Sequence, residues 1–115
     1  MNEPEITYEN FTSPDGNPEG GRVHGCNFAI TWQNGPLVAP DGSEIPRNGA
    51  FVEDIIHAAK QRIEYYQSTK FKCDENQIAI ESLDSALEAI QKRQSRRSSE
   101  GTAGTHQVDQ EPSAA

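Results

Sequence analysis

The chain has 115 residues, of which 33% are hydrophobic, and its formal net charge is −8 at pH 7. This length fits one small domain, and no segment reaches the roughly 20 apolar residues that a membrane span needs. General nucleic-acid binding relies on neutralising many phosphates, which an acidic protein does poorly. No signal-peptide pattern opens the chain. We therefore expect a soluble cytoplasmic protein that binds no membrane, DNA or RNA.

The charge is unevenly distributed along the chain. Residues 1–20 carry five acids and no base, whereas residues 60–97 hold eight of the ten Lys and Arg against six acids. The second segment is therefore positive, at +2, in an otherwise acidic protein. A local positive patch of this kind suits a small phosphorylated ligand.

Both ends of the chain have the composition of disordered segments. Residues 1–21 are rich in Pro, Gly, Asn and acids without helical period, and residues 107–115 have a similar bias. We expect a disordered acidic arm at 1–21 and a disordered tail at 107–115. Residues 22–106 would form the ligand-binding domain.

The first predicted element is a strand in the segment "CNFAITWQ". Its apolar residues Cys26, Phe28, Ile30 and Trp32 alternate with smaller or polar ones, which puts the apolar set on one face. The following Asn-Gly at 34–35 is a strong turn signal. The segment "PLVAP" would return as a short strand and complete a β-hairpin or small sheet.

Two helices are predicted after this sheet. Asn48 can cap the first, and Asp74 can cap the second, which would run to about Arg97. The apolar residues that recur at helical spacing are Val52, Ile55, Ile56, Ala59, Ile63 and Tyr66, then Ile80, Leu83, Leu87 and Ile90. A short connection makes the pair an antiparallel helical hairpin. The predicted fold class is α+β.

A small sheet and two helices give a thin core. Domains of this size often gain stability by oligomerisation, and the apolar stripes exceed what one hairpin can bury. We therefore expect a homo-oligomer, either a dimer or a hexamer.

The sequence contains no motif for catalysis or metal binding. Nucleophile–base pairs, a P-loop, a dinucleotide-binding glycine pattern and a metalloprotease helix are missing from it. His24, Cys26, Cys73 and His106 fit no tetrahedral zinc spacing. We expect no enzyme, no metal and no cofactor.

Four residues are candidates for binding a ligand. Arg93 and Arg97 lie four apart, so a helix stacks them on one face, where two guanidinium groups suit a pyrophosphate. The alternative is that basic residues simply favour a helix C-terminus. Tyr66 could stack a base or be a partly buried aromatic, and Asn76 could bind an anion near a helix start or be an ordinary polar residue. Arg62 is interpreted as a partner of a nearby acid.

With these residues in view, the chain resembles the phage Thoeris anti-defence family of nucleotide sponges, type one, which shares a helical hairpin with anti-CBASS sponges. The resemblance spans residues 27–106. The matching motifs are Trp32–Pro36 for W/F-Q-N-G-P, Asn48-Gly49 at the first helix, "RIEYYQ" for R-[IL]-x-x-[FY]-Q, "FKCDEN" for F-x-C-x-E-N, and "RQSRRSSEGTAGTH" for R-T-x-x-R-x-x-R-G-V-E-G-T-H.

This resemblance implies a function. Family members sequester cyclic nucleotide immune signals, notably glycocyclic ADP-ribose and in some cases cyclic oligonucleotides, without cleaving them. Tyr66 would stack the base, Asn76 would hydrogen-bond it, and Arg93 and Arg97 would hold the pyrophosphate. The protein would then act in the cytoplasm of the infected bacterial host.

The chain departs from the family pattern near its end. Gln94 replaces a Thr, Glu100 replaces an Arg, and Thr102-Ala103 replaces Val-Glu. The reversed charge at Glu100 would weaken or retune ligand binding, with Arg96 as a candidate compensation. Gly101 and Gly104 would permit a turn after the helix, so that "GTAGTH" packs over the site.

The spacing of the candidate residues also predicts how the site is built. Asn76 and Arg93 are 17 residues apart, which is about 25 Å along a helix. One nucleotide cannot reach both ends of one hairpin, so we expect a site shared between two subunits. The alternative function is a small phage or prophage assembly module that binds no nucleotide.

Overall fold

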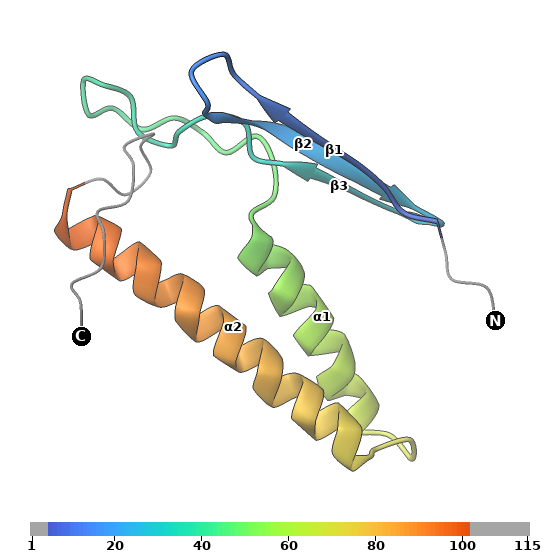
Figure 1. The fold of residues 1–115 in the computed structure, drawn as a ribbon. Helices are drawn as coiled ribbons and strands as arrows, with labels where there is room; N and C mark the ends of the chain where they lie inside the picture. Colours follow the sequence, from blue (N-terminus) through green and yellow to red (C-terminus); the bar gives the residue numbers. More distant parts are fainter. Residues whose placement is uncertain (1–4, 102–115) are drawn as a thin grey trace. The chain divides into compact units, whose positions relative to one another are not determined.

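The structure is a computed structural model and describes residues 5–101. It contains a three-stranded sheet followed by two helices, so the predicted α+β class is confirmed (Figure 1). The elements are β1 (Thr7–Thr12), β2 (Pro18–Gly25), β3 (Phe28–Trp32), α1 (Val52–Gln67) and α2 (Asp74–Ser99).

The chain divides into two compact units. Met1–Ala50 and Arg97–Ala115 make one unit, and Phe51–Arg96 make the other. We call residues 5–50 the β unit and Phe51–Arg96 the helical hairpin, and we describe each by itself. Among the residues that the structure describes, neither helix is both long and apolar enough to cross a bilayer.

The sheet corrects the expectation for the N-terminal arm. Its order is β1-β2-β3 with antiparallel neighbours. All of β1 and half of β2 lie inside the segment expected to be disordered. Composition gave the wrong prediction because the glycines of β2 interrupt the alternation of apolar and polar side chains that marks a strand. Gly20 has φ 78° and Gly21 has φ 149°. Residues 7–12, "TYENFT", are rich in Thr, Tyr and Phe, which favour strands despite the acidic surroundings.

The tight turn of the sheet also differs from its predicted position. Gly25 pairs with Phe28, so Cys26 and Asn27 form a two-residue loop between β2 and β3, with Asn27 at φ 61°. The strand in "CNFAITWQ" is confirmed as β3. The expected return strand is not formed in the described residues, because "PLVAP" makes only an isolated bridge from Val38 to Glu44.

One row of side chains across the sheet is apolar. Tyr8 pairs with Val23, and Val23 pairs with Ile30, so all three lie on the same face. Val23 is buried, whereas Tyr8 at the edge strand is 65% exposed. The ring of Phe28 covers Gly25, where an added Cβ would lie 2.0 Å from Cε1 of that ring. An aromatic ring over a strand glycine fills the space that a side chain would otherwise occupy.

The helical hairpin contains α1 and the part of α2 up to Arg96, joined by residues 68–73. Asn48 does not cap α1, because that helix begins three residues later than the cap prediction required. Phe51 is the N-cap residue, and its backbone N–H donates to the carboxylate of Asp54 at 2.8 Å. Asp74 is the first residue of α2 rather than its cap. The predicted apolar positions of α2 are buried or half-buried, whereas in α1 Val52, Ala59 and Tyr66 are exposed.

Polar links hold the two helices together. Lys60 on α1 forms an ion pair with Asp84 on α2 at 2.6 Å, and Gln94 on α2 donates a hydrogen bond to Glu53 on α1. Apolar burial is small, since Ile80 is the one buried hydrophobic residue of the hairpin among those described. The thin core agrees with the sequence, while oligomerisation stays a prediction.

Candidate functional site

Hydrogen bonds join the family motifs at Trp32–Pro36 and Asn48-Gly49. They connect the end of β3 to the residues before α1. The Asn48 side chain accepts from the Asn34 backbone N–H at 2.8 Å and donates to the Asn34 carbonyl at 2.8 Å. Gln33 Oε1 accepts from the backbone N–H groups of Asn48 and Gly49 at 2.9 and 3.3 Å. These motif residues therefore bind one another, and their role in the β unit is structural.

Backbone pairing reinforces this connection. The Gln33 N–H donates to the Ala50 carbonyl at 2.9 Å, and the Ala50 N–H donates to the Thr31 carbonyl at 2.7 Å. Gly49 immediately precedes Ala50. A Cβ added to Gly49 would lie 2.5 Å from the carbonyl carbon and oxygen of Trp32. Backbone atoms this close leave no room for a side chain, so the sequence requires glycine here.

The loop end of the helical hairpin carries an aromatic cluster in the last turn of α1. Tyr65 and Tyr66 have ring centroids 5.9 Å apart, with the rings tilted by 54°. The Arg62 guanidinium carbon lies 4.9 Å from the Tyr65 centroid and 5.0 Å from the Tyr66 centroid. Arg62 Nε also donates to the Tyr66 hydroxyl at 3.2 Å. The hydrogen bond to Tyr66 raises the pKa of Arg62 above its usual value, so the guanidinium stays charged.

This geometry corrects the interpretation of Arg62. Among the described residues its contacts are the two tyrosine rings and the Tyr66 hydroxyl, and it pairs with no acid. Residues three and four apart are neighbours on a helix, so the spacing of Arg62, Tyr65 and Tyr66 contained the signal. Tyr65 was not among the residues predicted from the sequence.

The loop joins the end of α1 to the start of α2 (Figure 1). Tyr66 is in the last turn of α1 and Asn76 is in the first turn of α2, so both lie at this end of the hairpin. Gln67 fixes the loop: it donates to the Cys73 carbonyl at 3.1 Å and accepts from the Cys73 N–H at 2.9 Å. Asn76 is half-buried in the first turn of α2, and the ring of Tyr66 is exposed. A ring and an amide are thus presented by neighbouring ends of two helices.

The structure places the candidate arginines near the other end of α2. Arg93 is exposed, whereas Arg97 is buried with 5% of its surface accessible. Buried arginines are rare unless they are paired. Although the two arginines are four residues apart, their side chains are therefore not equally accessible. Nothing in the sequence around Arg97 predicted its burial.

The end of α2 agrees with the predicted turn. The helix stops at Ser99, and Gly101 adopts φ 76° with its N–H donating to the Ser98 carbonyl at 3.2 Å. A glycine in the left-handed region is a common helix terminator. Glu100 is half-buried, and its Oε2 is buried without a hydrogen-bond partner in the described part of the chain. The expectation that "GTAGTH" packs over the site concerns residues that, apart from Gly101, lie outside the described range.

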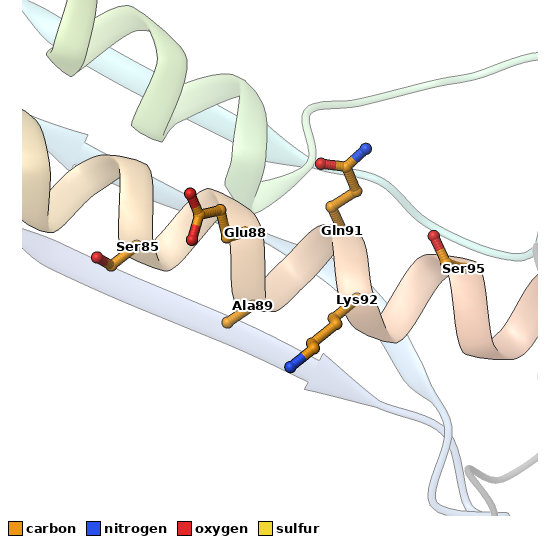
Figure 2. Close-up of a pocket in the computed structure, with 6 residues that line it drawn as sticks. All are labelled: Ser85, Glu88, Ala89, Gln91, Lys92 and Ser95. Atoms are coloured by element: carbon orange, nitrogen blue, oxygen red, sulfur yellow. The ribbon is translucent and has the colours of Figure 1, made fainter.

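A hollow of about 510 Å³ runs along α2 and includes none of the candidate residues in its lining. Its six lining residues all belong to this helix and are Ser85, Glu88, Ala89, Gln91, Lys92 and Ser95. Figure 2 shows their side chains spread along the helix rather than converging on one point. Because ligand sites combine an enclosed shape with converging polar groups, this surface is not the candidate site.

No cluster of three or more His, Cys, Asp or Glu residues within residues 5–101 has the proximity to hold a metal ion. Cys26 and Cys73 are both exposed free thiols. The binding groups of the candidate residues are the aromatic ring of Tyr66, the amide of Asn76 and the guanidinium groups of Arg93 and Arg97.

Comparisons with known proteins identify the architecture. Residues 26–95 match the family model described as the Acb2/Tad1 hairpin domain. The chain is also 36% identical over 78 residues to Thoeris anti-defense 1 of Bacillus phage SBSphiJ7, an alignment that covers 68% of this chain and 51% of the relative. The chain thus spans about half the length of that curated relative. Since the family model covers more than half of its residues, the chain belongs to the Acb2/Tad1 hairpin family.

Proposed function

We propose that this protein is a phage anti-defence protein that sequesters a cyclic nucleotide immune signal of the glycocyclic ADP-ribose class and so inhibits Thoeris-type immunity. The observation that carries the proposal is the pairing of family membership with an exposed aromatic cluster at the loop end of the hairpin. Cyclic oligonucleotides form the second ligand class. The protein would act in the cytoplasm of the infected host, where such signals are made.

Tyr66 and Asn76 would bind the base of the ligand. Stacking of a nucleobase on an aromatic side chain contributes about 1–3 kcal/mol. Asn76 offers both a donor and an acceptor, so it can pair with the polar edge of a base. The position of both residues at one end of the hairpin supports this assignment.

Arg93 and Arg97 would hold the pyrophosphate, because a guanidinium fork matches two phosphate oxygens. Arg93 is exposed and is the first contact in this proposal. Arg97 would join it only after its buried guanidinium becomes accessible to the ligand. Arg93 therefore carries more of the expected affinity than Arg97.

The proposed site is shared by two subunits. Tyr66 and Asn76 lie at one end of the hairpin and Arg93 lies 17 residues after Asn76 on α2, about 25 Å away along the axis. A second copy running in the opposite direction would bring its arginine end to the first copy's loop end. The small apolar core of one hairpin favours such an assembly, as a dimer or as a hexamer of dimers.

We infer that the ligand is held and not cleaved. Hydrolysis of a pyrophosphate or glycosidic bond needs a positioned acid or base with a pKa near neutral, or a metal-activated water. The assigned residues are a phenol, an amide and two guanidinium groups, which supply a stacking surface and hydrogen bonds. They suit binding, and inhibition would then follow from removal of free signal.

Calorimetry with glycocyclic ADP-ribose tests the proposal directly. We expect saturable heat release, and Arg93→Ala is expected to weaken binding about tenfold to a hundredfold, since it removes a hydrogen-bonded charge. Mass spectrometry after heat denaturation of the complex should return the ligand intact.

Three results would count against the proposal. A cleaved ligand would make the protein an enzyme. No heat with glycocyclic ADP-ribose or with a panel of cyclic oligonucleotides would favour the assembly module that binds no nucleotide. Equal affinity of Arg93→Ala and wild type would remove the arginine end from the site.

A further inference from the structure

Exposed aromatic side chains are poor binding platforms when they move freely. A ligand that stacks on such a ring must first restrict its rotation, which reduces affinity. Tyr66 is 41% exposed and lies in the last turn of α1, where apolar packing restrains it little. Its orientation therefore depends on local partners.

Arg62 is the partner with the right geometry. It lies one helical turn before Tyr66, donates from Nε to the Tyr66 hydroxyl at 3.2 Å, and places its guanidinium carbon 5.0 Å from the ring centroid. Two different contacts to one ring, at its hydroxyl and at its π system, define a single orientation.

Tyr65 gives Arg62 a second aromatic contact. Its centroid lies 4.9 Å from the guanidinium carbon, so one planar group contacts two rings that are themselves 5.9 Å apart. A guanidinium is flat and keeps charge and donors in one plane, whereas an ammonium is a compact point charge. Lys at position 62 would keep the charge but could not make all three contacts.

We propose that Arg62 is a positioning residue that fixes the ring of Tyr66 in the orientation required for stacking a nucleobase, with Tyr65 as its support. This inference rests on the proposed function for its ligand, but the ordering of the ring is a property of the free protein. The two can therefore be tested separately.

The first experiment measures ring motion without ligand. Full-length protein labelled with ¹³C in its tyrosine rings is compared by NMR relaxation for wild type, Arg62→Ala and Arg62→Lys, with Tyr66→Phe used to assign the Tyr66 signal. We expect an ordered Tyr66 ring in wild type and a mobile one in both variants. An equally ordered ring in Arg62→Ala overturns the proposal.

Lys70→Ala is the matched control for this experiment. Lys70 also places a cation over an aromatic ring in the same hairpin, 5.3 Å from the Phe71 centroid. Within the described range, the ring of Tyr66 is in cation–π contact with Arg62 and not with Lys70. Removal of the Lys70 side chain should leave the Tyr66 ring ordered. A comparable loss of order in this variant would show that any charge removed near the loop has the same effect.

The second experiment measures affinity for glycocyclic ADP-ribose. Arg62→Ala and Arg62→Lys are each expected to weaken binding about three- to tenfold, the scale for one side chain that must be ordered on binding. Lys70→Ala should bind as wild type does, and thermal unfolding midpoints should match across the set. Full affinity in Arg62→Lys would mean that charge alone matters, which overturns the positioning role.

The two experiments separate two kinds of failure. If wild type binds no glycocyclic ADP-ribose, the proposed function fails while the ring-motion result still decides whether Arg62 orders Tyr66. If the variants lose ring order but keep full affinity, binding stands and the positioning role is wrong.

Discussion

Polar residues of the family motifs have different roles in the β unit and in the helical hairpin. In the β unit, the polar side chains of Gln33 and Asn48 bond to backbone groups and close a connection between the end of β3 and the start of the helical region. In the hairpin, Arg62, Tyr66 and Arg93 are exposed. Motif side chains that bond to backbone groups maintain the local fold, whereas the Arg62 side chain bonds to the side chain of Tyr66. Resemblance to a family does not by itself distinguish the two.

Gly49→Ala is expected to have the largest effect on stability and tests the structural role of the β-unit motifs. Its Cβ would lie 2.5 Å from the Trp32 carbonyl atoms and 2.6 Å from the Gln33 nitrogen, so the backbone must shift. We expect the free energy of unfolding to fall by about 3 kcal/mol, or the protein not to fold. Urea unfolding measures this change.

Gly35→Ala is the control for this substitution. Gly35 has φ 88° and open space around it, so an alanine there meets no backbone atom. The expected cost is about 1 kcal/mol, from the positive φ alone. Equal losses for the two variants would show that Gly49 matters through its conformational freedom rather than through the close approach.

Asn48→Ala is expected to have an intermediate effect. It removes two hydrogen bonds to the Asn34 backbone, each at 2.8 Å, which predicts a loss of about 1–2 kcal/mol. Ligand affinity should be unchanged, because Asn48 is not among the residues assigned to the site. A variant with full stability but weakened binding would reverse the roles that we assign to the two regions.

The smallest expected effect concerns the exposed pair of Glu9 and Arg22 in the sheet. The hydrogen bond from Arg22, at 3.0 Å, lowers the pKa of Glu9 below its ordinary value of 4.5. A lowered pKa in the folded state stabilises the protein above pH 4.5, and this contribution disappears as the pH falls through the folded-state value. Because the pair is exposed, the change in stability should be slight.

NMR titration of Glu9 gives the clearest measurement of this pair. Arg22→Ala should return the pKa of Glu9 toward 4.5, with little change in unfolding midpoint at neutral pH. A large loss of stability at neutral pH would assign the pair a role in the fold that exposed ion pairs rarely have.

Local patterns predicted much of the fold. Alternation in "CNFAITWQ" located β3, and helical periodicity located α1 and α2, because each pattern extends over several consecutive residues. The same reasoning missed β1 and placed the turn wrongly. Because β2 is glycine-rich, its composition does not mark it as a strand, and its pairing with β1 and β3 does.

The features of the site were predictable to different degrees. Tyr66, Asn76 and Arg93 come from family motifs, and their role in binding stays a prediction. The contact of Arg62 with two tyrosines was missed, although helical spacing makes these residues neighbours. The role of Asn48 did not follow, because its partner Asn34 is 14 residues away. The burial of Arg97 likewise depends on tertiary structure rather than on its neighbours in sequence.

The central claim is that one ligand is held by the loop end of one hairpin and the arginine end of another. Mixing two variants that each bind the ligand weakly tests it most directly. Tyr66→Ala and Arg93→Ala are prepared with different tags, denatured together, refolded as an equal mixture and titrated with glycocyclic ADP-ribose. Native mass spectrometry confirms that mixed oligomers have formed.

A shared site in a symmetric dimer predicts recovery of binding. Half of the dimers in the mixture contain both variants, and one of their two sites combines an intact Tyr66 with an intact Arg93, so about a quarter of all sites should bind with wild-type affinity. A site within one subunit predicts none, since every chain carries one substitution. Mixed oligomers that bind no ligand, alongside wild type that does, would contradict the shared site.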